Sequence, residues 1–65
     1  MNIAKSVNVA LAMAEKNKPW LAREMGISLE TLYRRIAVNN PKAESIQQFA
    51  DALKMKPSEL IALGE

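Results

Sequence analysis

Apolar residues recur at steps of three and four along this 65-residue chain, which is the period of an amphipathic α-helix. Short segments that contain glycine, proline or asparagine interrupt the pattern, and no segment alternates apolar and polar residues as a strand does. The sequence therefore predicts an all-α fold of five short helices. We expect these helices at about 2–15, 18–25, 29–38 and 43–53, with the fifth beginning at Pro57.

The size of the chain indicates a single domain over residues 1–65, because two cores would each fall below the roughly 40 residues needed to fold unaided. Hydrophobic residues make up 49% and charged residues 25%, as in ordinary globular proteins. Since cysteine is absent, disulfides and thiolate metal sites are excluded, and buried aliphatic side chains must hold the fold. We interpret the four methionines as core residues that fill gaps.

Several classes of function are disfavoured by the composition. The chain has no histidine, the side chain most used for proton transfer near neutral pH, so we expect no enzyme, no cofactor and no metal site. No apolar run approaches the roughly 18 residues of a membrane span, and Lys5 interrupts the first apolar stretch. The net charge of +2 indicates binding to nucleic acid only if the Lys and Arg side chains are clustered on one surface. We expect a soluble cytoplasmic protein with no membrane partner.

The segment from Lys18 to Ala37 has the layout of two helices joined by a tight turn. Asn17 can cap the first helix, and Gly26 can adopt the left-handed conformation that ends it. Ser28 can cap the second helix with its hydroxyl, and Glu30 places a carboxylate in the first turn. The second helix has one apolar stripe, so we expect its other face to be free.

The stretch LAREMGISLETLYRRI resembles the Cro and phage-repressor family of helix-turn-helix proteins, whose pattern is LA-x-x-hydrophobic-G-hydrophobic-S followed by a recognition helix. Downstream, Pro41 followed by IQQFADALKM and SELI is similar to the fourth and fifth helices of that family. The resemblance implies a lambda-repressor-like DNA-binding domain with its helix-turn-helix at about 18–37. It also implies a regulator of transcription that binds a double-stranded operator sequence-specifically, with the helix at about 29–38 in the major groove.

This resemblance assigns contacts with DNA to side chains in and around the second helix of the motif. The residues expected to face base edges are Ser28, Leu29, Glu30, Tyr33 and Arg34. Arg34 can fork onto guanine, Glu30 can accept from cytosine N4, and Leu29 can pack on a thymine methyl group, whereas the Tyr33 hydroxyl can hold a phosphate instead. The residues expected to contact phosphates are Lys18, Thr31, Arg35, Asn40 and Lys42.

Two residues depart from the family pattern. Arg35 stands where the family has an apolar or small residue, and we expect Ile36 to supply the packing while the Arg35 stem follows the edge of the core. Trp20 stands where the family has a polar residue, and it can either pack against a neighbouring helix or contact a partner. Glu30 can act solely through the helix dipole. We expect Arg34 to be free of ion pairs.

The partners implied are double-stranded DNA and a second copy of the chain, because one domain contacts too few base pairs for high specificity. We expect a homodimer, at least on DNA, formed through residues 59–65, where Ile61 and Leu63 exceed what a short helix can bury. No small-molecule ligand is expected. The alternative is a protein-binding module on the same fold, such as an antitoxin, with Trp20 and the apolar C-terminal segment as anchors.

Overall fold

The computed structural model describes residues 2–38 and 41–65, and within these ranges the chain contains five helices and no strand. The helices are α1 (Ile3–Ala14), α2 (Lys18–Met25), α3 (Leu29–Ile36), α4 (Ala43–Ala52) and α5 (Pro57–Leu63). The predicted all-α class and five short helices are therefore confirmed. The end of α3 was predicted too late, because the helix stops at Ile36 and Ala37 forms its cap.

Local side-chain chemistry sets the ends of the first three helices. The side-chain oxygens of Asn2, Asn17 and Ser28 each accept the backbone N–H three residues on, at 3.1, 2.9 and 3.1 Å. Pro19 stands in the first turn of α2, where a missing N–H costs nothing. Gly26 ends α2 with a φ of 69°, which is a left-handed conformation that glycine adopts without strain. The connection to α3 is therefore short and defined.

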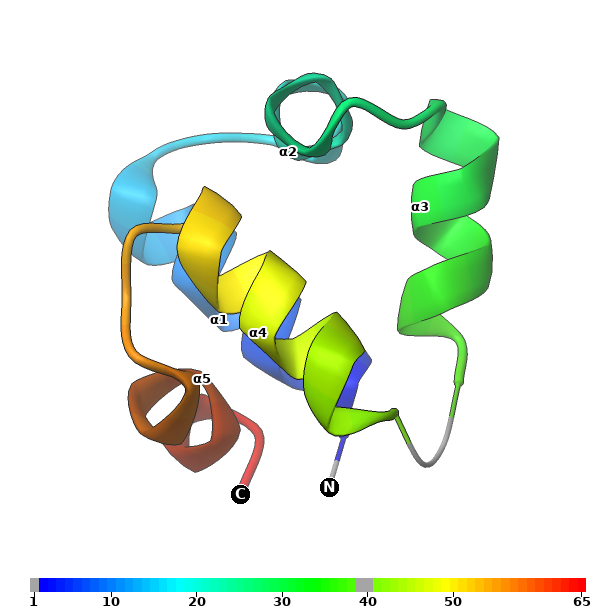
Figure 1. The fold of residues 1–65 in the computed structure, drawn as a ribbon. Coiled ribbons are helices and arrows are strands. Elements are labelled where there is room, and N and C mark those ends of the chain that lie inside the picture. Colours follow the sequence, from blue (N-terminus) through cyan, green and yellow to red (C-terminus); the bar gives the residue numbers. More distant parts are fainter. Residues whose placement is uncertain (1, 39–40) are drawn as a thin grey trace.

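One hydrophobic core receives side chains from all five helices. Its centre is formed by fully buried residues of large volume, among them Phe49, Leu21, Leu32 and Leu60. Burying each such side chain contributes about 1.5–3 kcal/mol, which is the main source of stability in so small a domain. α5 packs against α1 and α4, and α2 packs against α3 and α4. Figure 1 shows that α3 stands at one edge of the molecule, so that part of its surface is left uncovered.

The beginning of α1 and the end of α5 lie against each other. The Ser6 hydroxyl is buried and donates to the Asn2 carbonyl at 3.2 Å. Gly64 packs so closely on this turn that a Cβ there would lie 2.7 Å from the Asn2 carbonyl oxygen and overlap the Ser6 hydroxyl. Lys5 Nζ also donates to the Glu65 carbonyl at 3.2 Å. The absence of a side chain at Gly64 therefore allows α5 to approach α1.

The interpretation of the methionines as core residues is wrong for Met13, whose exposed fraction is 70%. Met25 and Met55 are half-buried against the core, as expected, while Met1 lies outside the described residues. Ala14, which stands four residues after Ala10 on the apolar spacing of α1, is also exposed. Both Met13 and Ala14 line an open groove at the end of α1.

A helix that spans a membrane must be both long and apolar. In residues 2–38 and 41–65, no helix combines the length and the apolar character required to span a bilayer.

Candidate nucleic-acid interface

The connection between α2 and α3 is anchored to the end of α2 by backbone hydrogen bonds and to the start of α3 by the Ser28 cap. Gly26 N–H donates to the Arg23 carbonyl at 3.1 Å, and Ile27 N–H donates to the Ala22 carbonyl at 3.0 Å. Ile27 is half-buried against the core, and Ser28 then caps α3. Since every residue of this connection is held, α3 has a fixed direction relative to α2.

α3 divides into a buried side and an open side. Leu32 is fully buried and Ile36 is nearly so, four residues apart on one stripe of the helix. Beside this stripe, Leu29 is 36% exposed and Tyr33 is 50% exposed. We use the name outward face of α3 for the exposed residues Leu29, Glu30, Tyr33 and Arg34.

Arg34 is paired with Glu30 on this face, so the expectation that it would be free of ion pairs is wrong. Its Nη2 lies 3.2 Å from Glu30 Oε1, with the two side chains 75% and 84% exposed. Glu30 stands four residues before Arg34, which is the spacing at which helix side chains meet. A pair this exposed contributes about 0.2–1 kcal/mol, so a base edge can replace either partner at small cost.

The hydroxyls at the start of α3 are bonded to each other. Ser28 Oγ accepts from the Thr31 N–H at 3.1 Å and donates to Thr31 Oγ1 at 2.8 Å. The Ser28 hydroxyl proton is therefore used in a hydrogen bond within the protein, whereas the Thr31 hydroxyl can still donate its own proton. Ser28, predicted to face a base, serves here as the helix cap, and Thr31 is the better placed donor for a phosphate oxygen.

Two of the predicted phosphate ligands stand at helix starts. Lys18 is the first residue of α2 and is half-buried, and Lys42 precedes α4 and is exposed. Across the described residues Arg34–Glu30 forms the one ion pair, so neither lysine is bound to a carboxylate. Both ammonium groups are consequently available to an anion. Asn40, which was also predicted to contact phosphate, lies outside the described residues.

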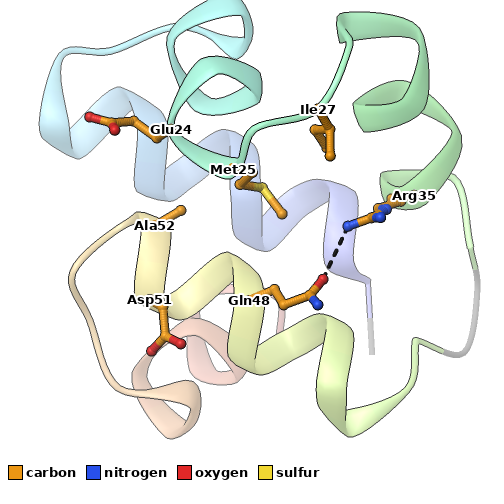
Figure 2. A pocket seen from close by; sticks show the side chains of 7 residues that line it. All are labelled: Glu24, Met25, Ile27, Arg35, Gln48, Asp51 and Ala52. Atoms are coloured by element: carbon orange, nitrogen blue, oxygen red, sulfur yellow. Dashed lines mark hydrogen bonds between the residues drawn. The ribbon is translucent and has the colours of Figure 1, made fainter.

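Arg35 is turned away from the outward face and toward α4. Its Nη1 donates to Gln48 Oε1 at 3.0 Å, and Figure 2 shows this bond spanning the space between α3 and α4. The prediction that Ile36 supplies the packing contact is confirmed by its burial. Half-buried Arg35 follows the edge of the core, as expected, but its guanidinium is held by a side chain of the protein. A phosphate contact would use guanidinium donors that this bond leaves free, or would replace the bond.

A pocket of about 430 Å³ opens beside Arg35, between α2, α3 and α4. Its lining is shown in Figure 2 and consists of Glu24, Met25, Ile27, Arg35, Gln48, Asp51 and Ala52. The middle is apolar, and Arg35 with Gln48 forms one polar side. The Asp51 carboxylate accepts a hydrogen bond from the Gln47 amide at 2.7 Å. No nucleophile with a neighbouring base lines the pocket, so these residues offer no recognisable catalytic arrangement.

Trp20 packs rather than projecting as an anchor. It is half-buried against the core, and the Lys16 ammonium lies 5.5 Å from the centre of its ring. This is within the distance at which a cation is attracted to an aromatic face. Of the two roles considered for Trp20, the structure therefore supports packing within the chain.

Two residues of interest were not singled out from the sequence. Gln48, which holds Arg35, had no signal, because the contact joins residues 13 positions apart. Val38, 47% exposed just beyond α3, was counted as the last residue of that helix.

Comparison with protein-family models found no matching family, and searches of curated proteins and of solved structures found no similar protein. The function must therefore be inferred from the chemistry of the chain's own residues.

Proposed function

We propose that this chain is a sequence-specific double-stranded DNA-binding regulator of transcription, with a lambda-repressor-like helix-turn-helix formed by α2 and α3. The observation that carries this proposal is the outward face of α3. A helix fixed at the edge of the molecule by Leu32 and Ile36 presents a cation, a carboxylate, a phenol and an aliphatic side chain together. A helix with side chains is about 10–12 Å wide, which matches the major groove.

Base edges are recognised by three groups of this face in our proposal. The Arg34 guanidinium forks onto O6 and N7 of guanine, and the Glu30 carboxylate accepts from N4 of cytosine. Because these two side chains already touch, at 3.2 Å, they read adjacent or paired bases rather than distant ones. Leu29, one turn before Tyr33, packs against a thymine methyl group.

Phosphate groups are held by donors around this face. Lys18 and Lys42 provide unpaired ammonium groups at the starts of α2 and α4, and the Thr31 hydroxyl provides a neutral donor. Tyr33 reaches a base or a phosphate with its hydroxyl, and Arg35 reaches a phosphate with the donors that its bond to Gln48 leaves free, or by leaving Gln48. Asn40 completes the set of phosphate ligands in this proposal.

Regulation follows from occupancy of the operator, since a bound protein blocks polymerase without further chemistry. The mode of action proposed is that of a phage-type repressor in a bacterial or phage-infected cell. A pair of copies on two half-sites about one helical turn apart doubles the number of bases contacted. We therefore propose a homodimer, at least on DNA.

Selection of binding sites from random duplexes tests the proposal, followed by affinity measurements with Arg34→Ala and Arg34→Lys. We expect one sequence to be enriched and Arg34→Ala to bind it roughly 5- to 160-fold more weakly, since a bidentate contact contributes about 1–3 kcal/mol. Arg34→Lys keeps the charge but loses the fork, so it should retain affinity for random duplex while losing preference. If no sequence is enriched, or if Arg34→Ala binds like wild type, the proposal is wrong.

A protein-binding module, such as an antitoxin, is the second candidate. Trp20 no longer favours it, because that ring is half-buried against the core and covered by Lys16. Met13 does favour a protein contact, because its large apolar side chain is 70% exposed.

A further inference from the structure

The pocket between α2, α3 and α4 has an apolar middle and a polar side. Figure 2 shows Met25 and Ile27 pointing into the space between the helices, while Arg35 and Gln48 meet at one side of it. The volume of about 430 Å³ lies within the roughly 300–1,000 Å³ that is usual for sites that bind small molecules. The pocket therefore combines the size of a ligand site with apolar walls and convergent polar groups.

Arg35 brings an unpaired charge to this pocket. Its side chain is half-buried, and Gln48 Oε1, which accepts its hydrogen bond at 3.0 Å, is neutral. In residues 2–38 and 41–65 the one ion pair joins Arg34 to Glu30, so no carboxylate there neutralises Arg35. Moving a charge out of water is costly unless an opposite charge is paired with it. An anion in the pocket would supply that partner.

Arg35 and Gln48 both keep N–H groups that can bind such an anion. The guanidinium has several donors in a fixed fork, and the bond to Gln48 uses Nη1. Gln48 takes part in this bond through its oxygen, so its amide nitrogen can still donate. Donors from two side chains that meet at one side of a pocket fit an acceptor with two oxygens. A carboxylate has this geometry and binds a guanidinium bidentately.

We propose that this pocket binds a small carboxylate with an apolar body. Arg35 and the Gln48 amide nitrogen hold the carboxylate, and the apolar body lies against Met25, Ile27 and Ala52. An aromatic ring suits these walls, because the thioether of methionine makes favourable contacts with aromatic rings. This inference replaces the expectation of no small-molecule ligand, since helices that are separate in the sequence form the pocket only when they pack.

Two carboxylates on the other side of the pocket set the direction of the ligand. Figure 2 shows Glu24 and Asp51 on the side away from Arg35, with their carboxylates turned outward. Both residues are exposed, and Asp51 accepts a hydrogen bond from Gln47 at 2.7 Å. Water and salt screen the repulsion from exposed charges, whereas a contact pair at half-buried Arg35 is screened less. The carboxylate of the ligand therefore lies at Arg35, and its apolar end lies toward Ala52.

The surroundings of the pocket favour a free small molecule over a protein partner. The most exposed large apolar side chains of the described residues are Met13, Leu29, Tyr33 and Val38, and none of them lines this pocket. A stable protein interface buries about 800 Å² per partner around an apolar core. Since the apolar contacts here lie inside the hollow, the occupant must be small enough to enter it.

Occupancy of the pocket affects DNA binding through Arg35. This effect rests on the proposed function, in which Arg35 contacts a phosphate, whereas binding of the carboxylate does not rest on it. A carboxylate on the guanidinium uses the donors and neutralises the charge that a phosphate needs. The carboxylate and the operator must then weaken each other by the same factor. The carboxylate therefore acts as an inducer, which releases the regulator from DNA.

NMR titration of the full chain tests the site with phenylacetate and two control probes. Phenylacetamide has the same shape without the charge, and acetate has the charge without the apolar body. We expect phenylacetate to shift the backbone signals of residues 24–27 and 48–52, which include the lining of the pocket. It should bind roughly tenfold more tightly than either control, because each control lacks one of the two kinds of contact.

Two variants remove the anion site in different ways. Arg35→Met deletes the guanidinium, and Gln48→Glu places beside it a carboxylate that competes with the ligand. Gln48 is exposed, so this second variant keeps the test valid if Arg35→Met fails to fold. Arg23→Met is the matched control, because Arg23 is exposed on α2 and does not line the pocket. We expect phenylacetate to bind roughly tenfold more weakly to the first two variants and unchanged to Arg23→Met.

The effect on DNA is measured with saturating phenylacetate against chloride at the same ionic strength, since DNA binding itself depends on salt. We expect the affinity of wild type for a selected duplex to fall roughly fivefold or more, and that of Gln48→Glu to stay the same.

The outcomes separate this inference from the proposed function. If phenylacetate shifts no signal of the pocket, or binds Gln48→Glu as it binds wild type, the inference is wrong, although DNA binding stands. If it binds as expected but leaves the affinity for DNA unchanged, the site is confirmed and its role as an inducer site is overturned. If no DNA is bound, the proposed function falls, and the titration without DNA still decides whether the pocket binds the carboxylate.

Discussion

Among single residues, the two glycines are needed for different reasons. Gly26 has a positive φ of 69° but no atom within 4 Å of where its Cβ would stand. Gly64 has an ordinary φ of −94°, but a Cβ there would lie 2.7 Å from the Asn2 carbonyl oxygen. The first glycine relieves backbone strain, and the second relieves a steric overlap between helices.

Replacing Gly26 should therefore destabilise the fold through the backbone alone. We expect Gly26→Ala to lower the free energy of unfolding by about 1–2 kcal/mol, since the left-handed conformation costs that much for a residue with a Cβ. Gly26→Asn should cost less, because asparagine tolerates this conformation better. Urea denaturation of both variants measures the difference, and equal losses for Ala and Asn would exclude backbone strain as the cause.

Glu30 offers a second test at the same scale, because it is an ion-pair partner of Arg34 and, in the proposed complex, a carboxylate facing DNA. Glu30→Gln removes an exposed pair and a carboxylate from the first turn of α3, so the unfolding free energy should fall by about 0.5–1.5 kcal/mol. Affinity for random duplex should rise, since Arg34 is released and a negative charge is lost. The preference for cytosine over other bases at the position that Glu30 contacts should weaken. Unchanged sequence preference by competition binding would show that Glu30 acts only on the helix.

Among the helices, the one whose orientation matters most is α3, which is fixed by its buried stripe, its cap and the Arg35–Gln48 bond. The stripe and the cap could be predicted, because apolar spacing and a serine before a helix are local signals. The bond to Gln48 could not, because its partners are far apart in sequence and meet only when α3 and α4 pack. The Arg34–Glu30 pair is also a local signal, because its four-residue spacing is that of helix neighbours, in contrast to the expectation of a free Arg34.

The Arg35–Gln48 bond should restrain Arg35 from phosphate. We expect Gln48→Ala to bind random duplex several-fold more tightly than wild type, because a bond of about 0.5–1.5 kcal/mol no longer holds the guanidinium. The matched control is Gln47→Ala, whose side chain bonds Asp51 instead. Adding Arg35→Met to Gln48→Ala should abolish the gain. If Gln48→Ala binds like Gln47→Ala, Arg35 serves only to join α3 to α4.

For the whole molecule, five short helices around one core leave the outward face of α3 at one edge and the open groove at the end of α1 at another. Periodicity predicted the helices and most of the core, since residues such as Phe49 and Leu60 fall on clear stripes. The exposure of Met13 could not be predicted from hydrophobicity, because it depends on which sides of α1 the other helices cover. Because the core is small, a loss of one or two kcal/mol of stabilising contacts removes a large fraction of the stability of the fold.

The outward face of α3 is tested most directly by measuring the affinity for a selected duplex between about 50 and 200 mM salt. Wild-type affinity should fall linearly on logarithmic axes, with a slope of about −0.9 for each phosphate neutralised. Arg34→Ala should lose the preference for the selected duplex over a random one at every salt concentration. Affinity that does not change with salt, or a preference that survives Arg34→Ala, would contradict the assignment of α3 as the helix that reads DNA.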